Sequence, residues 1–343
     1  PIPDHQKAVD LLLEALVEHK IVHSLDEIKG AGHRIVQGGS YFADSAVANE
    51  DVVEKVSELS DLAPLHNPAH LVCYEAFKKA LPEVGHVFVF DTAFHHTMPE
   101  ESYLFPVPYD WYKQYGVRRY GAHGTSHYYV SRRCAELMGK DINHMNIITC
   151  HLGNGASLTA IKDGKSVNTS MGLAPLGGIM MGTRSGDIDP TVVFYMAKKL
   201  GADWDEMDTY LNKRSGMLGV SGISSDARDI QAAYNEGDPR AVLTVNLYVN
   251  RMINVLGGYY TELGHVDAIV FTAGLGENDV NMRERILKRS EEALGLSIDY
   301  DLNRSVHGEE MKISKDDSKI AVYVIPTNEE LVIARDTVRL LGL

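Results

Sequence analysis

Two arginines lie in stretches of sequence that leave a side chain little room in solvent. Arg34 lies between apolar residues in GHRIVQGG (32–39), and Arg184 lies in the glycine-rich stretch GGIMMGTRSGDIDP (177–190). A guanidinium withdrawn from water needs an anion, and its planar fork fits a carboxylate or a phosphate. A surface or salt-bridging position is the alternative for any single arginine, but the flanking strands and glycines here favour an anion-binding role.

Two carboxylates lie where site residues often occur. Asp91 ends the apolar strand VFVFD, and the carboxyl end of a strand is a common site position in α/β proteins. Glu329, followed by Glu330, begins the last helix, where a carboxylate could hold Mg²⁺ directly or through water. Capping of a turn or helix, and the helix dipole, are the alternatives for these residues taken singly.

Four histidines lie in or beside predicted loops: His66, His123, His127 and His151. Glycines on both sides of His123, in RRYGAHGTSH (118–127), place it in a loop just ahead of a helix. A structural hydrogen bond is the ordinary role for such a histidine. The spacing of the four matches no known set of metal ligands.

Two glycine-rich segments follow apolar runs. CHLGNGASLTA (150–160) lies between MNIIT and the turn KDGK, which predicts a β-hairpin. TAGLGEN (272–278) is expected to form a glycine loop that leads from a buried strand to a helix. Neither contains G-x-x-x-x-G-K-[ST] or G-x-G-x-x-G, so a P-loop and a nicotinamide-dehydrogenase fold are both disfavoured. The hairpin suits phosphate bound by backbone N–H groups, because glycine allows close approach.

Together these residues name one chemistry. Two arginines, a histidine, an aspartate, a carboxylate for magnesium and two glycine-rich segments are what phosphoryl transfer requires. Such catalysis consists mostly of positioning the reactants and neutralising negative charge that is spread over phosphate oxygens.

The elements expected to position these residues form an α/β pattern. Helical spacing predicts helices over 6–19, 44–60, 67–82, 126–139, 189–201, 240–263, 279–295 and 328–341. Strands are expected over 32–39, 86–95 and 320–326, at the start of 267–278, and in a meander over 146–170. Asn67 is the expected cap of its helix, and 97–118, which is rich in Pro, Tyr and Glu, is expected to be a connection. The alternation of strands and helices predicts α/β architecture.

The length and composition of the chain limit the classes of protein to which it can belong. The 343 residues suffice for two domains or one large one, and the net charge of −14 makes nucleic acid an unsuitable partner. No apolar run approaches the ~18–20 residues of a membrane span, and the N-terminal residues do not resemble a signal peptide. The three cysteines, Cys73, Cys134 and Cys150, lack metal-type spacing and fit a reducing, cytoplasmic location.

At this point the chain resembles the acetate kinase family, a branch of the acetate and sugar kinase/Hsp70/actin superfamily. IITCHLGNGASLTAIKDG resembles the family's second signature, and the likeness covers essentially all 343 residues. Further matching stretches occur in the family's order: GHRIVQGG, LAPLHNP, VFDTAFH, RRYGAHGTSH, GLAPLGGIMMGTRSGDIDP, DARDI, TAGLGEN and IPTNEELVIARDT.

The resemblance implies a fold and an activity. The fold is two α/β domains of the actin-like, ribonuclease H-like type, with a cleft that closes on binding. The first domain would comprise 1–93 and 328–343, and the second, nucleotide-binding and dimerisation domain would comprise 94–327. The activity is reversible transfer of the ATP γ-phosphoryl group to acetate, giving acetyl phosphate and ADP, with Mg²⁺ or Mn²⁺ and in a homodimer.

The resemblance also implies residue roles. Arg34 and Arg184 would bind the carboxylate and the transferring phosphoryl group, Asp91 would orient the reactants, His123 would donate to the phosphoryl oxygens, and Glu329 would hold magnesium. The acetate methyl pocket would be formed by Val36, Leu65, Ala122 and Pro175. The nucleotide would be bound by His151, Leu152, Gly153, Asn154, Gly155, Asp226, Ala227, Arg228, Gly274, Leu275, Gly276, Glu277 and Asn278.

The sequence departs from the family at three places. Ala122 occupies a position where the family usually has Phe, which keeps propionate or butyrate kinase open as an alternative. Gln37 replaces a usual histidine. The family's opening strand and N-x-G-S-S-S-x-K loop do not occur, so we expect a truncated first domain. A catalytically impaired nucleotide-binding fragment is therefore a further alternative.

Overall fold

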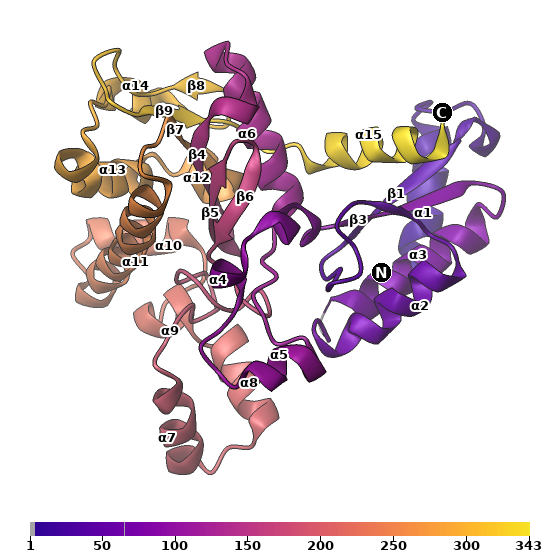
Figure 1. The fold of residues 1–343 in the computed structure, drawn as a ribbon, viewed down its shortest axis with the longest axis horizontal. Helices are drawn as coiled ribbons and strands as arrows, with labels where there is room; N and C mark the ends of the chain where they lie inside the picture. The colour runs from indigo at the N-terminus through magenta and orange to yellow at the C-terminus, as the bar shows by residue number, and fades with distance from the viewer. Residues whose placement is uncertain (1–3, 65) are drawn as a thin grey trace.

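The computed structural model describes residues 4–64 and 66–343, and these residues form two β-sheets with helices on their faces (Figure 1). In the smaller sheet, β1 (Gly30–Ile35) runs parallel to β3 (Gly85–Phe90), and β2 (Ala46–Val47) pairs antiparallel with β3. Parallel strands in register bring their carboxyl ends to one edge. Arg34, which lies opposite Val89, and Asp91, which follows β3, therefore meet at that edge.

Helices cover both faces of the smaller sheet. α2 (Glu50–Glu58) and α3 (Asn67–Ala80) enclose a core that includes Ile35 and Phe88, and α1 (His5–Glu18) packs on α3. α15 (Glu329–Leu341) lies along the opposite face (Figure 1). A Cβ on Gly32 would collide with Ile333 and Thr337 of α15, so the missing side chain is what lets the helix lie against the strand.

The larger sheet has the strand order β6-β5-β4-β7-β9-β8. β4 (Asn146–Leu152), β5 (Ala156–Lys162) and β6 (Lys165–Thr169) form an antiparallel meander, as predicted. β7 (Ala268–Thr272) runs parallel to both β4 and β9 (Ala321–Val324), and β8 (Met311–Lys312) closes the far edge in the antiparallel direction. The hairpin turn between β4 and β5 therefore projects from the same edge as the carboxyl end of β7.

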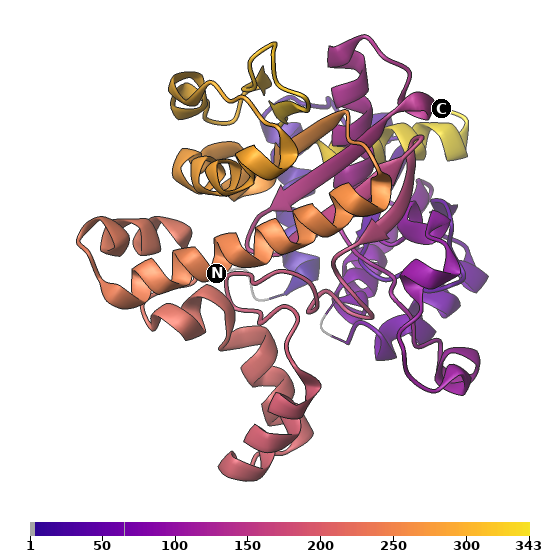
Figure 2. The same ribbon diagram turned by 60° about the vertical axis from the view of Figure 1, so that its left-hand side comes forward.

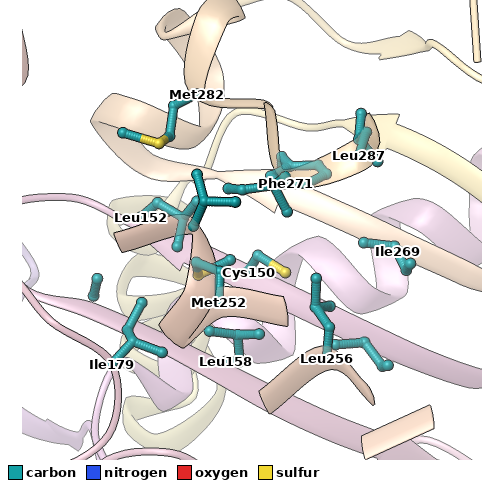
Figure 3. Packing of buried hydrophobic residues seen from close by; sticks show 14 of the residues in the cluster. Cys150, Leu152, Leu158, Ile179, Met252, Leu256, Ile269, Phe271, Met282 and Leu287 are labelled. Atoms are coloured by element: carbon teal, nitrogen blue, oxygen red, sulfur yellow. The ribbon is translucent and has the colours of Figure 1, made fainter. Parts of the chain in front are cut away.

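The principal core lies between the larger sheet and two helices, α11 (Pro239–Leu263) and α13 (Val280–Leu294). α11 crosses the sheet in Figure 2, and Figure 3 shows how its side chains interlock with those of the strands. α6 (Gly124–Met138) covers the other face over a second cluster. The labelled core residues of Figure 3 are Cys150, Leu152, Leu158, Ile179, Met252, Leu256, Ile269, Phe271, Met282 and Leu287. Cys134 is buried on the α6 side, whereas Cys73, on α3, is partly exposed.

Helices α7 (Pro190–Leu200) and α8 (Trp204–Lys213) form an arm that extends away from both sheets (Figures 1 and 2). The remaining α-helices are α4 (Glu100–Tyr103), α5 (Tyr109–Tyr115), α9 (Gly216–Ser221), α10 (Ala227–Asn235), α12 (Ala273–Asn278) and α14 (Tyr300–Ser305). Short 3₁₀ turns occur at Leu25–Glu27, Leu59–Asp61, Ala93–Thr97 and Ile142–His144.

The segment 97–118, expected to be a connection, contains two short helices, because α4 and α5 begin after Pro99 and Pro108. Three other sequence predictions are wrong in detail. The helix predicted over 44–60 begins only at Glu50, because Asn49 caps it and the preceding residues pair with β3. Asn67 is the first residue of its helix rather than its cap. The glycine segment 273–278 is a helical turn, α12, rather than a loop.

The chain returns to the smaller sheet at its C-terminal end, because α15 packs on β1 and β3 after β9 has completed its place in the larger sheet. This arrangement is compatible with a first domain of 1–93 and 328–343 and a second of 94–327, a division that stays a prediction. Among the described residues, no helix is both long enough and apolar enough to cross a membrane.

Candidate active site

An ion pair with a buried carboxylate and a partly exposed guanidinium lies at the carboxyl edge of the smaller sheet. Nε of Arg34 donates to Oδ1 of Asp91 over 2.9 Å, and Nη2 donates to Oδ2 over 2.6 Å. Asp91 is 1% exposed, whereas the Arg34 side chain keeps 42% of its surface exposed. The Asp91 charge raises the pKa of Arg34. The guanidinium is thus already oriented by a carboxylate, with one side still open to an incoming anion.

Glu329 lies close enough to this pair for the charges of Asp91 and Arg34 to act on it. Burial and, to a smaller extent, the negative charge of Asp91 together raise the pKa of Glu329 to about 7, although the Arg34 charge opposes the shift. Asn328 caps α15 by accepting from Leu331 N, so the helix begins at the site. Two carboxylates that disfavour each other's charge are a fit for a divalent cation with oxygen ligands.

The described residues contain no group of three or more His, Cys, Asp or Glu side chains arranged to hold a metal ion. Asp91 and Glu329 would therefore supply only part of a coordination sphere. Mg²⁺ commonly takes one or two carboxylates and completes its shell with water and substrate phosphate oxygens. The pair fits that pattern.

His123 precedes α6 in a left-handed conformation, with φ of +56°, which is uncommon for a residue with a Cβ. Its Nδ1 hydrogen-bonds Ser157 Oγ over 2.8 Å, and its ring stacks on His151 with centroids 4.0 Å apart. Burial lowers the pKa of His123 well below its usual value, and neighbouring histidines and arginines lower it further. The imidazole is therefore neutral at pH 7.

Gly155, in the β4–β5 hairpin, lies between His123 and Arg184. A Cβ placed on Gly155 would lie 3.2 Å from Arg184 Nη1 and 3.4 Å from His123 Nε2. Arg184 Nη1 donates to Pro175 O over 3.0 Å, and within the described residues this guanidinium has no carboxylate partner. A half-buried cation without a counter-ion beside a neutral imidazole is suited to bind an anion.

Three of the four residues predicted to form the methyl pocket lie within the described part of the chain. Val36 is buried at the end of β1, Ala122 is 2% exposed directly before His123, and Pro175 contacts Arg184 through its carbonyl. Leu65 lies outside the described residues. Gln37, the unusual neighbour of Val36, donates from Nε2 to Leu173 O over 3.4 Å and so joins the smaller sheet to the 170s loop.

A cavity of about 780 Å³ opens on the other side of the hairpin. Eight of the predicted nucleotide residues line it: Gly153, Asn154, Asp226, Ala227, Arg228, Gly274, Leu275 and Asn278. These come from three segments that are far apart in the sequence. Arg228 folds back on Asp226, with Nη2 and Oδ2 2.6 Å apart, and this contact lowers the pKa of Asp226 to about 2.

Five predicted nucleotide residues lie outside this lining: His151, Leu152, Gly155, Gly276 and Glu277. Leu152 belongs to the core, and Gly276 packs against Phe271. The Glu277 carboxylate accepts from Ala273 N over 2.7 Å and from Thr327 N over 3.0 Å, so it fastens α12 to the end of β9. A direct contact of Glu277 with nucleotide is thus not evident from its geometry.

The cavity also contains residues that the sequence did not single out: Gly182, Met217, Ser225, Gln231, Asp279, Val280, Asn281 and His307. Ser225 and Asp279 adjoin predicted segments and could have been found by extending them. Met217 and His307 carried no signal, because they reach the cavity only through tertiary packing.

Comparisons with known proteins agree with this geometry. The chain matches the Acetokinase family over residues 1–335. The acetate kinase of Geobacillus kaustophilus is 52% identical over 342 residues, which make up 100% of this chain and 86% of that protein.

Two solved structures resemble the fold throughout. The acetate kinase of Porphyromonas gingivalis has a TM-score of 0.94 at 45% identity, over 99% of this chain and 85% of its own. A propionate kinase from Francisella tularensis has a TM-score of 0.92 at 41% identity, over 98% of this chain and 84% of its own. The fold is accordingly the actin-like α/β type expected from the sequence, and the chain belongs to the acetokinase family.

Proposed function

We propose that this protein transfers the γ-phosphoryl group of ATP to acetate, giving acetyl phosphate and ADP, and catalyses the reverse reaction. The observation that carries the proposal is the position of the β4–β5 hairpin. Gly153 and Asn154 line the large cavity, while Gly155 adjoins His123 and Arg184. A nucleotide in the cavity would extend its terminal phosphate over the hairpin toward the cluster of charged groups.

Each group has a part in this transfer. Acetate is already ionised at pH 7, so it needs positioning rather than deprotonation. Arg34, oriented by Asp91, and Arg184 would bind the acetate carboxylate and the moving phosphoryl group. His123 would donate a hydrogen bond to a phosphoryl oxygen, and Glu329 would hold Mg²⁺ or Mn²⁺. The ion, when bound, would neutralise charge on the phosphate oxygens.

The test is formation of acetyl phosphate by the purified chain. The chain is incubated with ATP, MgCl₂ and acetate, and the product is trapped with hydroxylamine as the hydroxamate. Arg184→Ala should lower kcat about 10²–10³-fold, because a preorganised partner for developing charge is lost. Arg289→Ala, which removes an exposed arginine on α13, is the matched control. Absence of hydroxamate from the parent chain would refute the proposal.

Propionate is the second candidate acceptor, favoured by Ala122. A small buried residue beside His123 leaves more room than the phenylalanine usual in the family. Ala122→Phe should lower kcat/KM for propionate more than kcat/KM for acetate. One methylene changes discrimination by only ~1–3 kcal/mol, so the shift in the ratio will be modest. An unchanged ratio of the two kcat/KM values would exclude a role for Ala122 in acceptor choice.

A homodimer formed through the 94–327 region is also part of the proposal. The α7–α8 arm supports it, because the described residues of α7 include none that is buried. Phe194 and Trp204 on this arm are 62% and 66% exposed, and their rings contact each other edge-on. Val192, Tyr195 and Leu200 of α7 are also exposed. Several large apolar side chains left exposed on one arm are typical of a protein–protein contact.

A further inference from the structure

A chain of hydrogen bonds leads from the interior of the larger sheet to His123. Thr149 Oγ1 lies 2.7 Å from Nδ1 of His127, whose Nε2 lies 2.8 Å from Ser157 Oγ. Ser157 Oγ in turn lies 2.8 Å from Nδ1 of His123. Thr149 and Ser157 come from β4 and β5, His127 lies in the first turn of α6, and His123 is the residue that precedes this helix.

Which atom donates in each of these hydrogen bonds follows from the Thr149 hydroxyl, at the buried end of the series. Thr149 is fully buried, and in the described part of the chain its hydroxyl contacts only His127. A buried hydroxyl hydrogen without an acceptor is costly. The Thr149 hydroxyl therefore donates to Nδ1 of His127, and that nitrogen carries no proton.

The remaining protons are then determined one after another. Burial lowers the pKa of His127 well below its usual value, so the ring is neutral and carries its single proton on Nε2. This N–H donates to Ser157 Oγ, and the one hydroxyl hydrogen of Ser157 donates to Nδ1 of His123. The proton of neutral His123 must then lie on Nε2, the nitrogen that faces Gly155 and Arg184.

We propose that Thr149, His127 and Ser157 are positioning residues that hold His123 in the Nε2–H tautomer, so that it presents a neutral donor to the phosphoryl group. The inference rests on the proposed function for its purpose, but not for its geometry. With the opposite polarity His123 would present a bare nitrogen, which repels phosphate oxygens instead of binding them. The hydrogen bond to the second ring nitrogen is what selects between these forms.

The test reads the tautomer directly. ¹⁵N chemical shifts of histidine-labelled protein distinguish protonated from bare ring nitrogens, and a His123→Gln sample identifies the His123 signals. The wild-type chain should show bare Nδ1 and protonated Nε2 at both His123 and His127. A proton on Nδ1 of His123 would overturn the proposal.

Two variants break the chain of hydrogen bonds while His123 itself is left unmutated. Thr149→Val removes the hydroxyl at the far end and should let His127, and with it His123, populate both tautomers. Ser157→Ala breaks the chain nearer to the site and should do the same. In each, kcat should fall about 10–100-fold, as for other lost supporting hydrogen bonds, with KM values retained. An unchanged His123 tautomer in a folded Thr149→Val or Ser157→Ala protein would overturn the proposal.

Matched controls separate this role from general stability. Thr149→Ser keeps the hydroxyl and should restore both the tautomer and kcat. Ser166→Ala removes another buried serine that hydrogen-bonds a buried ring, Nδ1 of His95 at 2.9 Å, and should leave His123 unchanged. The NMR readout needs no turnover. If the protein shows the predicted tautomers but forms no acetyl phosphate, the positioning role of Thr149, His127 and Ser157 is supported while the proposed function is refuted.

Discussion

Asp91 and Glu329 both lie near the guanidinium of Arg34, which within the described residues forms hydrogen bonds only with Asp91. Each of the three residues could be singled out from the sequence, because a strand end, a helix start and an arginine among apolar residues are local features. The sequence could not show that the three residues lie together, because this depends on the parallel register of β1 with β3 and on the return of α15 to that sheet. The residues were therefore predictable, but the effect of their charges on one another was not.

Glu329 makes stability depend on pH. The pKa of Glu329 is raised to about 7 in the folded chain, against the ordinary glutamate value of 4.5. Between these values the folded state binds more protons than the unfolded state, so the free energy of unfolding falls as pH rises from about 5 to 7. Glu329→Gln removes this pH dependence. The variant should therefore avoid a fall in the free energy of unfolding on the order of 2 kcal/mol.

Urea denaturation of the wild-type chain and of Glu329→Gln at several pH values measures this. The difference between the two free energies should move in favour of the variant as pH rises through 7. Glu330→Gln, at the exposed neighbouring position, is the control. A constant difference across this window would contradict the assignment.

At the scale of elements, the strands and long helices follow from periodicity, whereas the short elements depend on distant partners. α12 is the clearest case. Its glycines predicted a loop, but the carboxylate of Glu277 satisfies Ala273 N and ties the turn to Thr327, 50 residues further along the chain. The hairpin at 153–155, by contrast, needed only its own glycines and the flanking strands to be predicted.

α15 lies close to β1 because Gly32, like Gly30 before it, has no side chain that would collide with the helix. Gly32→Ala should destabilise the fold by about 1–3 kcal/mol, the usual cost of overpacking, and should lower kcat because α15 carries Glu329. Calorimetry and the kinase assay measure the two effects. Ile333→Ala, which removes one of the colliding side chains, should recover part of the loss in the double variant.

Gly257→Ala is the matched substitution for this prediction. It lies within α11, and no atom would come within 4 Å of the new Cβ. Alanine favours a helix over glycine by up to about 1 kcal/mol, so this variant should be as stable as the parent or more so. Equal effects of the two substitutions would argue against close packing as the cause.

In the molecule as a whole, the α7–α8 arm is the feature whose exposed apolar side chains are least explained by the contacts within one copy of the chain. The sequence predicted α7 from its cap and periodicity but did not predict α8, and the apolar side chains that the arm exposes to solvent have no contact that accounts for them within the described residues of one copy. Burial against a second copy would remove that surface from water.

Phe194→Glu combined with Trp204→Glu should therefore yield a monomer. Light scattering coupled to gel filtration should give about the 37.9 kDa of one chain for the variant and twice that mass for the parent. Tyr115→Glu changes an aromatic residue of α5 that is 69% exposed outside the arm, and it should leave the mass unchanged. A monomeric parent chain would rule out this role for the arm.

The cysteines have a practical consequence for following motion between the two sheets. Cys134 and Cys150 are buried, and burial raises the pKa of both thiols, so neither is available to alkylating reagents in the folded chain. Cys73 is the partly exposed thiol, and it lies on α3 beneath the smaller sheet. A maleimide dye or spin label would attach there without engineered cysteines, and a second label on the arm would turn any rotation of the sheets into a measurable distance.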